Sequence, residues 1–584
     1  MRRALTAAVT LALLLAMAAP VGAATGTEAL TSVGSPPAPF AENKQNEPAV
    51  AIDANHPNVL AAGANDEIDL EACNAGNDTT CPFTVGVGVS GIYFSFDSGK
   101  TWTQPTYTGW SARNCQGVVG NSDPPCQPQA GGPIGTVPLY FENGLVADGD
   151  PAVAFGPRLG TNGRFTWANG SRLYYANLTS NFGATRSEEV FKGFEAIAVS
   201  RTDDVVSAAA SDKNAWMPPV LVSKQSSTTF SDKEQIWADN AASSPFFGTV
   251  YVCWAAFRGE EISPNAVPAP LQVAVSHDGG DTWIQRQISA AANNGQRNPP
   301  DGCTIRTDSK GVAYVFGVGT SSSGGHQAFE IMSRSFDGGS LWSTPQPVIG
   351  PVTQPGVFDP VLGRPTIDGI AGARSDLAPA PSVDIANGAP MGADATDRIV
   401  MSYVSGEITK PHVYFTESTN GGNTWTTPRA IEGPTDRGYY AAPAISPNGA
   451  SVYVVYNAFT TPYQSKTSTP RSLVGVLMQA ASSANPATPT GAFSEIHRSM
   501  PGDPRGSSQN NLVAEFLGDY VYAAATRTYG VAVWNDTRNA ADCAAIDAWR
   551  QSLRDGTSMP RPAPQQDCAP TFGNSDIWSF TTAP

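Results

Sequence analysis

Short apolar stretches rich in β-branched and aromatic residues recur along the whole chain, with glycine, proline or aspartate between them. Examples are Leu271-Gln-Val-Ala-Val275 and Val250-Tyr-Val-Cys-Trp254. Stretches of this length and composition, bounded by turn residues, are typical of β-strands. The pattern therefore predicts a chain of many short strands joined by turns.

One of these turns is repeated as an octapeptide. Four copies share Ser, Gly and Trp at fixed positions; they begin at Ser95, Ser276, Ser335 and Ser418 and end at Trp102, Trp283, Trp342 and Trp425. The third position is Asp in the first three copies and Asn420 in the fourth. Aspartate accepts backbone N–H bonds across a tight turn, glycine supplies a positive φ, and tryptophan packs as the next strand begins. The octapeptide thus predicts a β-hairpin turn.

A second pattern marks the first strand of a repeated unit. It is clearest in Glu47-Pro-Ala-Val-Ala-Ile-Asp53 and Asp150-Pro-Ala-Val-Ala-Phe155. Counting first strands gives seven units, which begin near residues 47, 150, 233, 302, 380, 442 and 519. Four-stranded units that stack radially form a β-propeller. We predict an all-β fold, a β-propeller of four-stranded blades. Seven blades are favoured; six is the alternative, because the fifth and sixth units are weakly marked.

The two ends of the chain are expected to complete the ring. The last unit ends at Asp576-Ile-Trp-Ser-Phe580, with little chain left for a fourth strand. We therefore expect residues 24–45 to supply a closing strand. Residues 46–584 would form the propeller, with insertions rich in proline and glycine at 103–147, 351–379 and 555–571.

The N-terminal residues indicate export. Arg2 and Arg3 precede an apolar run from Ala4 to Ala19, and small residues follow up to Ala23. This order is typical of a secretory signal peptide, here residues 1–23 with cleavage near Ala23. No later apolar run approaches the ~18 residues that span a bilayer. We expect a secreted protein without a transmembrane segment.

Composition and charge narrow the classes of partner. The 57 Gly and 48 Pro disfavour a mostly helical fold. A net charge of −16 leaves nothing to neutralise a run of phosphates, so nucleic acid is excluded as a partner. We expect a monomer that needs no cofactor, with a structural Ca²⁺ as the open alternative.

The eight cysteines fit an exported chain. An even number favours disulfides in that compartment, although the sequence alone allows 105 connectivities. Separation makes four pairs plausible: Cys73 with Cys81, Cys115 with Cys126, Cys253 with Cys303, and Cys543 with Cys568.

The octapeptides resemble Asp-box repeats, also called bacterial neuraminidase repeats. Together with Asn46-Glu-Pro-Ala-Val-Ala-Ile-Asp53 and Phe516-Leu-Gly-Asp-Tyr520, they make the chain resemble exported bacterial proteins of the sialidase superfamily. The resemblance covers nearly all of the chain after the signal peptide. It implies a propeller with these turns on outer hairpins, a glycan or glycoconjugate as partner, and either hydrolysis or binding as the function.

Sialidase chemistry implies a particular set of residues. In that family a Tyr nucleophile is activated by a Glu, an Asp is the acid/base, and an arginine cluster binds the sugar carboxylate. The family's early Arg-Ile-Pro signature is absent here: Glu47-Pro48 stands in its place, and the nearest Arg-Pro is Arg364-Pro365. Three arginines converging near a Tyr–Glu pair would favour an enzyme. Absence of such a cluster would favour a binding propeller.

The residues that open the first strands are expected to face the central mouth. The aligned position holds Glu47, Asp150, Lys233, Asp301 and Asp519, with Ala380 and Ala442 in the other two units. Two carboxylates across a mouth can act as acid and base in glycoside cleavage, or they can hold a hard cation such as Ca²⁺. The alternative is that each acid caps a strand or turn.

These patterns select the candidate residues. The catalytic candidates are Asp150 or Glu47 as acid/base, and Tyr520 as nucleophile with Asp519 as its orienting group. The substrate-binding candidates are Lys233, Asp301, Arg364, Arg437 and Tyr440. Core packing is the alternative role for the tyrosines. The predicted function is a secreted, glycan-directed and exo-acting sialidase-like glycoside hydrolase; the alternative is a non-catalytic propeller that binds a glycan or protein through its mouth.

Overall fold

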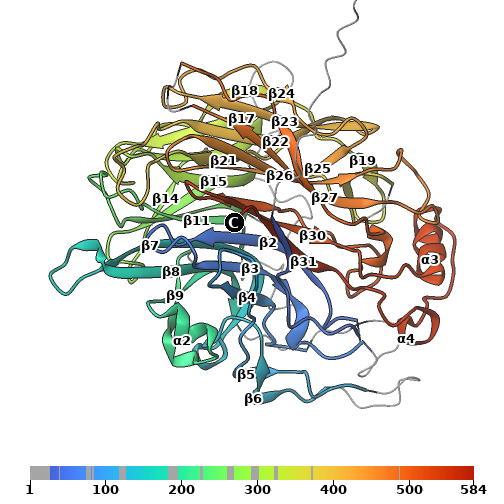
Figure 1. The fold of residues 1–584 in the computed structure, drawn as a ribbon. Coiled ribbons are helices and arrows are strands. Elements are labelled where there is room, and N and C mark those ends of the chain that lie inside the picture. The colour runs from blue at the N-terminus through green and yellow to red at the C-terminus, as the bar shows by residue number, and fades with distance from the viewer. Residues whose placement is uncertain are drawn as a thin grey trace, which may run out of the picture.

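Seven antiparallel sheets follow one another along the chain and stand in a ring (Figure 1). This computed structural model describes residues 26–38, 40–73, 81, 84–117, 126–181, 195–223, 228–258, 269–290, 301–320, 327–369, 372–483, 485 and 487–584. The expected signal peptide, residues 1–23, lies outside the described residues.

The first three sheets contain the N-terminal half of the ring. Their strands, from the axis outward, are β2 (Gln45–Ile52), β3 (Leu60–Asp66) and β4 (Ser90–Ser95); β7 (Leu145–Leu159), β8 (Phe165–Asn181), β9 (Ala196–Thr202) and β10 (Trp216–Leu221); and β11 (Thr229–Ala238), β12 (Val250–Arg258), β13 (Leu271–Ser276) and β14 (Ile284–Gln287). In the first sheet the fourth position is a single bridge between Phe94 and Thr103.

The next three sheets have four strands each. They are β15 (Asp301–Thr307), β16 (Ala313–Thr320), β17 (Ala328–Ser335) and β18 (Gln346–Val352); β21 (Ser382–Ile385), β22 (Ile399–Glu407), β23 (Lys410–Ser418) and β24 (Arg429–Ala430); and β25 (Arg437–Ile445), β26 (Ser451–Phe459), β27 (Leu473–Ala481) and β28 (Ser494–Arg498). The first strands of neighbouring blades contact one another around the whole ring. The prediction of seven blades is confirmed.

The seventh blade joins both ends of the chain. It consists of β29 (Tyr522–Ala525), β30 (Gly530–Asp536) and β31 (Asp576–Thr581), with the N-terminal strand β1 (Thr27–Leu30) at its outer edge. Thr27 lies opposite Thr581, and Arg538 Nη2 is 2.6 Å from Glu28 Oε1. In Figure 1, blue β2 lies beside red β30 and β31. The predicted closure by an N-terminal strand is confirmed.

The insertions carry the remaining elements. Two short hairpins are formed by β5 (Tyr107–Ser111) with β6 (Gln129–Ile134) and by β19 (Val357–Asp359) with β20 (Arg364–Thr366). Among the described residues the helices are α2 (Val205–Ala209) between β9 and β10, and α3 (Ala544–Arg554) and α4 (Pro564–Asp567) between β30 and β31, with single 3₁₀ turns elsewhere. Within the described part of the chain, no helix has the length and apolarity that a membrane crossing requires.

The four octapeptide turns share one hydrogen-bond pattern. In each, the serine hydroxyl accepts the N–H of the glycine four residues on, at 2.8–3.0 Å. The Asp or Asn side-chain oxygen accepts the N–H four residues after it at 2.9 Å. That glycine has φ between 78° and 89°, which residues with a Cβ rarely adopt. These hydrogen bonds and the positive φ explain why each turn has Ser, Asp or Asn, and Gly at the same positions.

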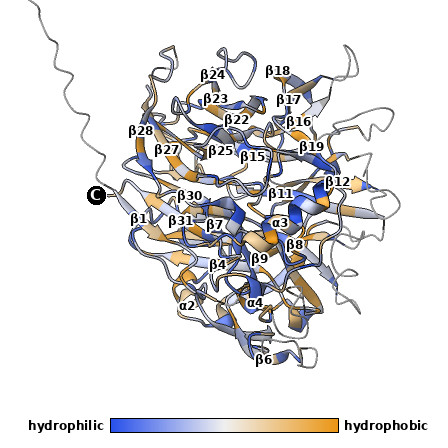
Figure 2. Ribbon diagram, turned by 90° about the vertical axis from the view of Figure 1, so that its right-hand side faces the viewer, coloured by the Kyte–Doolittle hydropathy of each residue, from blue (hydrophilic) through white to orange (hydrophobic). Residues whose placement is uncertain are grey.

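The hydrophobic core lies between neighbouring blades. Trp254 and Trp534 are each fully buried there. Gly475 on β27 has to be glycine, because a Cβ would come within 2.4 Å of the Trp534 ring. Strands such as β9 and β13 are buried along their whole length, because each blade packs against a neighbour on both faces. Figure 2 shows hydrophobic segments distributed over the strands of all parts of the ring.

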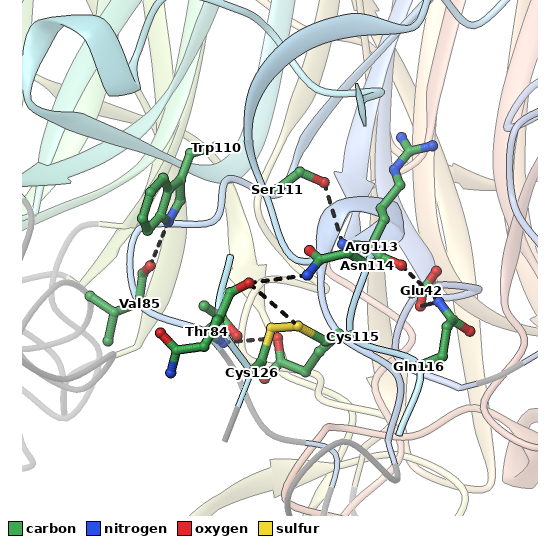
Figure 3. The surroundings of a disulfide bond; sticks show 12 residues. Glu42, Thr84, Val85, Trp110, Ser111, Arg113, Asn114, Cys115, Gln116 and Cys126 are labelled. Carbon is green, nitrogen blue, oxygen red and sulfur yellow. Dashed lines mark hydrogen bonds between the residues drawn. A yellow bond between two sulfur atoms is a disulfide. The ribbon is translucent and has the colours of Figure 1, made fainter. Parts of the chain in front are cut away.

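Four disulfides join the cysteine pairs that sequence separation made plausible. Cys253–Cys303 links β12 of the third blade to β15 of the fourth. Figure 3 shows Cys115–Cys126, where Gln116 Nε2 donates to Glu42 Oε1 at 3.3 Å and Trp110 Nε1 donates to Val85 O at 2.9 Å. These bonds attach the 103–147 insertion to the body of the first blade.

Candidate functional site

The first strands of three successive blades are bulged at the mouth of the ring. The register shifts in β2, β7 and β11 fall at Glu47, Asp150 and Lys233, where φ is 57°, 50° and 62°. Left-handed backbone at a residue with a side chain costs on the order of 1–3 kcal/mol, and bulges redirect side chains near functional sites. Three adjacent strained positions carrying two acids and a lysine therefore mark the mouth as the candidate site.

The bulges also correct the sequence alignment of the mouth. In β15 the shift and the positive φ of 52° fall on Gly302, so Asp301 stands one residue before the aligned position. In β25 the shift spans Tyr439 and Tyr440 and does not involve Ala442. A bulge adds one residue to one strand only, so counting along the repeats cannot place it.

Lys233 is the centre of the ionic cluster. Its Nζ is 3.2 Å from Asp150 Oδ2, 3.0 Å from Asp519 Oδ2 and 3.6 Å from Asp232 Oδ1. The side chains of Lys233 and Asp519 are only 11% and 4% exposed. The lysine therefore connects the second, third and seventh blades through ion pairs shielded from water.

Arg374 is the second cation of the cluster. Its Nη2 lies 2.6 Å from Asp519 Oδ2 and 3.4 Å from Glu47 Oε1, and its guanidinium lies 4.8 Å from the Phe516 ring centroid. The residue comes from the 351–379 insertion between the fourth and fifth blades, outside any repeat. Sequence reasoning missed it because no motif or periodicity marks that position.

Two tyrosines complete the wall of the mouth. Tyr520 Oη donates to Asp150 Oδ2 at 3.4 Å, and Lys233 Nζ lies 5.3 Å from its ring centroid. Tyr440 Oη is 3.0 Å from Asp519 Oδ1 and 2.9 Å from the Arg374 carbonyl oxygen. Tyr520 thus places a phenol between a carboxylate and an ammonium group.

Glu47 lies beneath these groups, with its side chain 1% exposed. Its Oε1 accepts the Asp519 N–H at 2.9 Å, and its Oε2 accepts Asn65 Nδ2 at 2.6 Å. Asn65 Oδ1 in turn accepts the Asp150 N–H at 2.6 Å. Glu47 therefore couples the first, second and seventh blades and supports the cluster from below.

The environment raises the pKa of some acids of the cluster and lowers the pKa of others. Burial and the neighbouring Asp150 charge raise the pKa of Glu47 well above its ordinary value. Burial also raises the pKa of Asp232 to about 8 and that of Asp301 to about 7. For Asp150, burial is outweighed by the Lys233 charge, which lowers its pKa. At neutral pH the cluster therefore contains an ionised Asp150 close to a protonated Asp232.

The remaining predicted residues lie around or away from this cluster. Asp301 opens β15, and its Oδ1 accepts the Gly302 N–H at 2.7 Å. Arg364 is 41% exposed and pairs with Asp376 at 3.2 Å. Arg437 is buried, paired with Asp368 and donating to Thr461 O at 2.8 Å. Within the described residues the mouth cluster thus combines one arginine with one lysine, not three arginines. The arrangement that would favour a sialidase is therefore absent there, and this observation by itself favours a propeller that binds through its mouth.

Two cavities lie along the axis of the ring. Lys233, Asp519, Tyr520 and Tyr440 help to line one of about 60 Å³ at the mouth. A second, of about 270 Å³, is lined by later residues of the first strands, with Arg306 3.5 Å from Asp384 as its ion pair. No group of three or more His, Cys, Asp or Glu side chains in the described ranges is arranged to hold a metal ion.

Comparison with known proteins gives likenesses of fold. Neither a family model nor a curated protein matches the sequence. Among solved structures, Hadza microbial sialidase Hz136 is 13% identical with a TM-score of 0.38, and the match covers 71% of this chain and 63% of that one. Leech intramolecular trans-sialidase is 11% identical with a TM-score of 0.39, and the match covers 71% of this chain and 65% of that one. The intramolecular trans-sialidase from Ruminococcus gnavus is 11% identical with a TM-score of 0.39, and the match covers 73% of this chain and 93% of that one.

The chain thus matches less than two thirds of the length of the first two of these proteins. At sequence identities this low, the matches bear on the fold of the chain and not on its activity. The class that the structure itself defines is a seven-bladed β-propeller whose mouth holds a buried cluster of acids, cations and tyrosines. The chemistry of the mouth has to be argued from its own residues.

Proposed function

We propose that this protein is a secreted, exo-acting glycoside hydrolase with a sialidase-like propeller, and that its substrate is a neutral sugar. The observation that supports an enzyme despite the missing arginine cluster is the Tyr520 phenol, which donates to Asp150 Oδ2 at 3.4 Å and has Lys233 Nζ 5.3 Å from its ring centroid. Tyr520, Lys233, Asp519 and Tyr440 also help to line the mouth cavity of about 60 Å³.

Tyr520 and Asp150 have the properties of a nucleophile and its base. Burial raises the pKa of Tyr520 well above its ordinary value, so the phenol needs a base to react. Asp150 is ionised and lies in hydrogen-bond contact with the phenol. In the proposed step Tyr520 Oη bonds to the anomeric carbon, its proton passes to Asp150, and the glycosidic C–O bond breaks.

Asp232 is the proposed proton donor to the leaving group. Its pKa of about 8 keeps it protonated at neutral pH, and its side chain is 14% exposed. Burial also raises the pKa of Glu47 well above its ordinary value, but at 1% exposure its side chain is too deep to reach a leaving oxygen. We therefore assign Glu47 to positioning Asp519 and Asn65, and Asp232 to acid catalysis. Water then attacks the anomeric carbon of the aryl glycoside formed with Tyr520: Asp232, now ionised, takes a proton from the water, the C–O bond to Tyr520 breaks, and the phenol regains its proton from Asp150.

The balance of charge favours a neutral substrate. A sugar carboxylate needs cations free to pair with it. Lys233 and Arg374 are already paired with Asp150, Asp519 and Glu47. An anionic sugar would have to displace these internal pairs, whereas a neutral sugar needs only hydrogen bonds.

A panel of aryl glycosides tests the proposal. The purified protein is expected to release the fluorophore from at least one neutral hexoside or pentoside, and to act at least about tenfold less efficiently on the sialoside. Fluorescence release at several substrate concentrations gives kcat/KM for each. Preference for the sialoside would show that the internal ion pairs open for an anion. No release from any glycoside would leave the alternative, a propeller that binds a glycan or protein through the same mouth.

The pH dependence of the same reaction tests the roles of the two aspartates. Asp150 has a lowered pKa and must be ionised, so activity should not fall until the pH is well below neutral. Asp232 must be protonated, so kcat/KM should fall about tenfold per pH unit above about pH 8. In Asp232→Asn this alkaline fall is expected to disappear with most of the activity. An alkaline fall unchanged in that variant would assign it to another group.

A further inference from the structure

A groove on the rim of the ring, separate from the mouth, lies between the fourth and fifth blades. It has a volume of about 620 Å³ and is bounded by β18 on one side and by β23 with the turn 419–428 on the other. Both Figure 1 and Figure 2 place β18, β23 and β24 together at the outer edge of the molecule. β18 is the outermost strand of its blade, so this groove is far from the axial cluster around Lys233.

Aromatic rings form one wall of the groove. Tyr403 and Tyr414 stand opposite each other on β22 and β23, with ring centroids 5.4 Å apart and planes at 26°. Trp425 is half-buried, and its Nε1 donates to Gly422 O at 3.1 Å, so the indole is held by its own turn. Flat apolar rings with polar edges are suited to pack against the C–H faces of sugar rings.

Uncharged hydrogen-bonding groups supply the rest of the lining. None of the residues that line the groove is Asp, Glu, Lys, Arg or His, although the chain carries a net charge of −16. In the described chain the hydroxyls of Tyr403 and Tyr414 have no hydrogen-bond partner, and Thr427 adds an exposed hydroxyl. Hydroxyl and amide groups without charge match the many hydroxyls of a neutral sugar.

The edge strand argues against a peptide as the occupant. A peptide that extends a sheet needs a row of free backbone N–H and C=O groups. β18 has the sequence Gln346-Pro-Val-Ile-Gly-Pro-Val352, and its two prolines lack the N–H. Its far end is already bonded to the fifth blade, because the Thr353 N–H donates to Ser405 Oγ at 2.8 Å.

We propose that this groove is a second carbohydrate-binding site, which holds a segment of neutral oligosaccharide against Tyr414 and Trp425. Binding of the oligosaccharide in this groove does not require catalysis at the mouth. A bound chain at the rim would keep the protein on a polymeric glycan while the mouth is free.

Calorimetric titration of the full-length secreted protein with neutral hexasaccharides tests this site. The probes are β-1,4-glucan, β-1,3-glucan, β-1,4-xylan and β-1,4-mannan hexamers. At least one is expected to bind, and Trp425→Ala should weaken it about tenfold, the equivalent of about 1.4 kcal/mol. The matched control is Trp342→Ala, which alters the same turn position in the fourth blade, where Nε1 donates to Gly339 O at 3.0 Å. Binding should also survive Tyr520→Phe.

A second variant keeps the test decisive if Trp425→Ala folds poorly. Thr427 is exposed on the groove wall, so Thr427→Arg should fold normally and block the groove with a bulky charge. The proposal is overturned if no hexasaccharide binds, or if binding persists in Thr427→Arg and is lost in Tyr520→Phe. Binding of a neutral extended decapeptide in place of the sugars, lost in Thr427→Arg, would overturn it in favour of strand addition.

Discussion

Tyr520→Phe is expected to lower kcat for the best neutral aryl glycoside by a factor of about 10²–10⁴, with little change in KM. The substitution removes one oxygen atom and keeps the ring that lies beside Lys233. Binding should therefore persist, while the atom that would attack the anomeric carbon is gone. Steady-state kinetics on both proteins gives the two constants separately.

A matched control shows whether the loss belongs to this phenol. Tyr453 on β26 is also buried, and its hydroxyl accepts Gln479 Nε2 at 3.2 Å, away from the mouth. Tyr453→Phe should leave kcat unchanged. If Tyr520→Phe retains wild-type kcat while Asp150→Asn is inactive, the carboxylates alone perform the reaction and Tyr520 only packs.

Lys233→Met is expected to lower the free energy of unfolding by about 3–5 kcal/mol at pH 7, because it leaves the buried Asp150 without its cation and Asp519 with Arg374 alone. Asp150 and Asp519 each lie within 3.2 Å of Lys233 Nζ. Methionine has a similar length, so lost packing contributes little. Urea unfolding followed by tryptophan fluorescence measures the difference.

The pH dependence of that difference follows from the sign of the pKa shifts. Lys233 lowers the pKa of Asp150 and of Asp519, so its stabilisation is present above the ordinary aspartate value and is lost as the pH falls through the folded values. In Lys233→Met both acids bind protons more readily. The difference in the free energy of unfolding between the wild-type protein and Lys233→Met should therefore become smaller as the pH is lowered from 7 toward about 4.

Lys310→Met provides the control for removal of a lysine. Lys310 is 76% exposed and pairs with Asp397 at 2.9 Å on the surface. Exposed pairs of this kind contribute about 0–1 kcal/mol, so its loss should be barely measurable. Equal effects at Lys233 and Lys310 would mean that the mouth cluster is open to water.

The blades could be predicted because their signals are local. The octapeptide turns and the strands before them depend on residues within a few positions of each other, such as Ser95 and Gly99. The same locality indicated the first strands at Glu47 and Asp150, and the expected closing strand from the N-terminal segment is β1, which pairs with β31.

The composition of the mouth was only partly predictable. Glu47, Asp150, Lys233, Asp519, Tyr520 and Tyr440 come together as one cluster. Arg374 joins it from an insertion, where folding of a loop decides the position and no repeat records it. Arg437 has the right residue type near the right strand, yet Asp368 from the same insertion pairs with it. Contacts made by irregular segments leave no periodic trace in a sequence.

Closure of the ring depends on strands from both ends of the sequence. Asp519 in the seventh blade donates its backbone N–H to Glu47 in the first, and β1 pairs with β31 near the C-terminus. Such contacts between distant residues form late and slowly. β31 pairs with β1 on one side and with β30 on the other, so its removal would separate the two ends of the seventh blade. The blade that carries Asp519 toward Glu47 is therefore held together by segments that are more than 500 residues apart in the sequence.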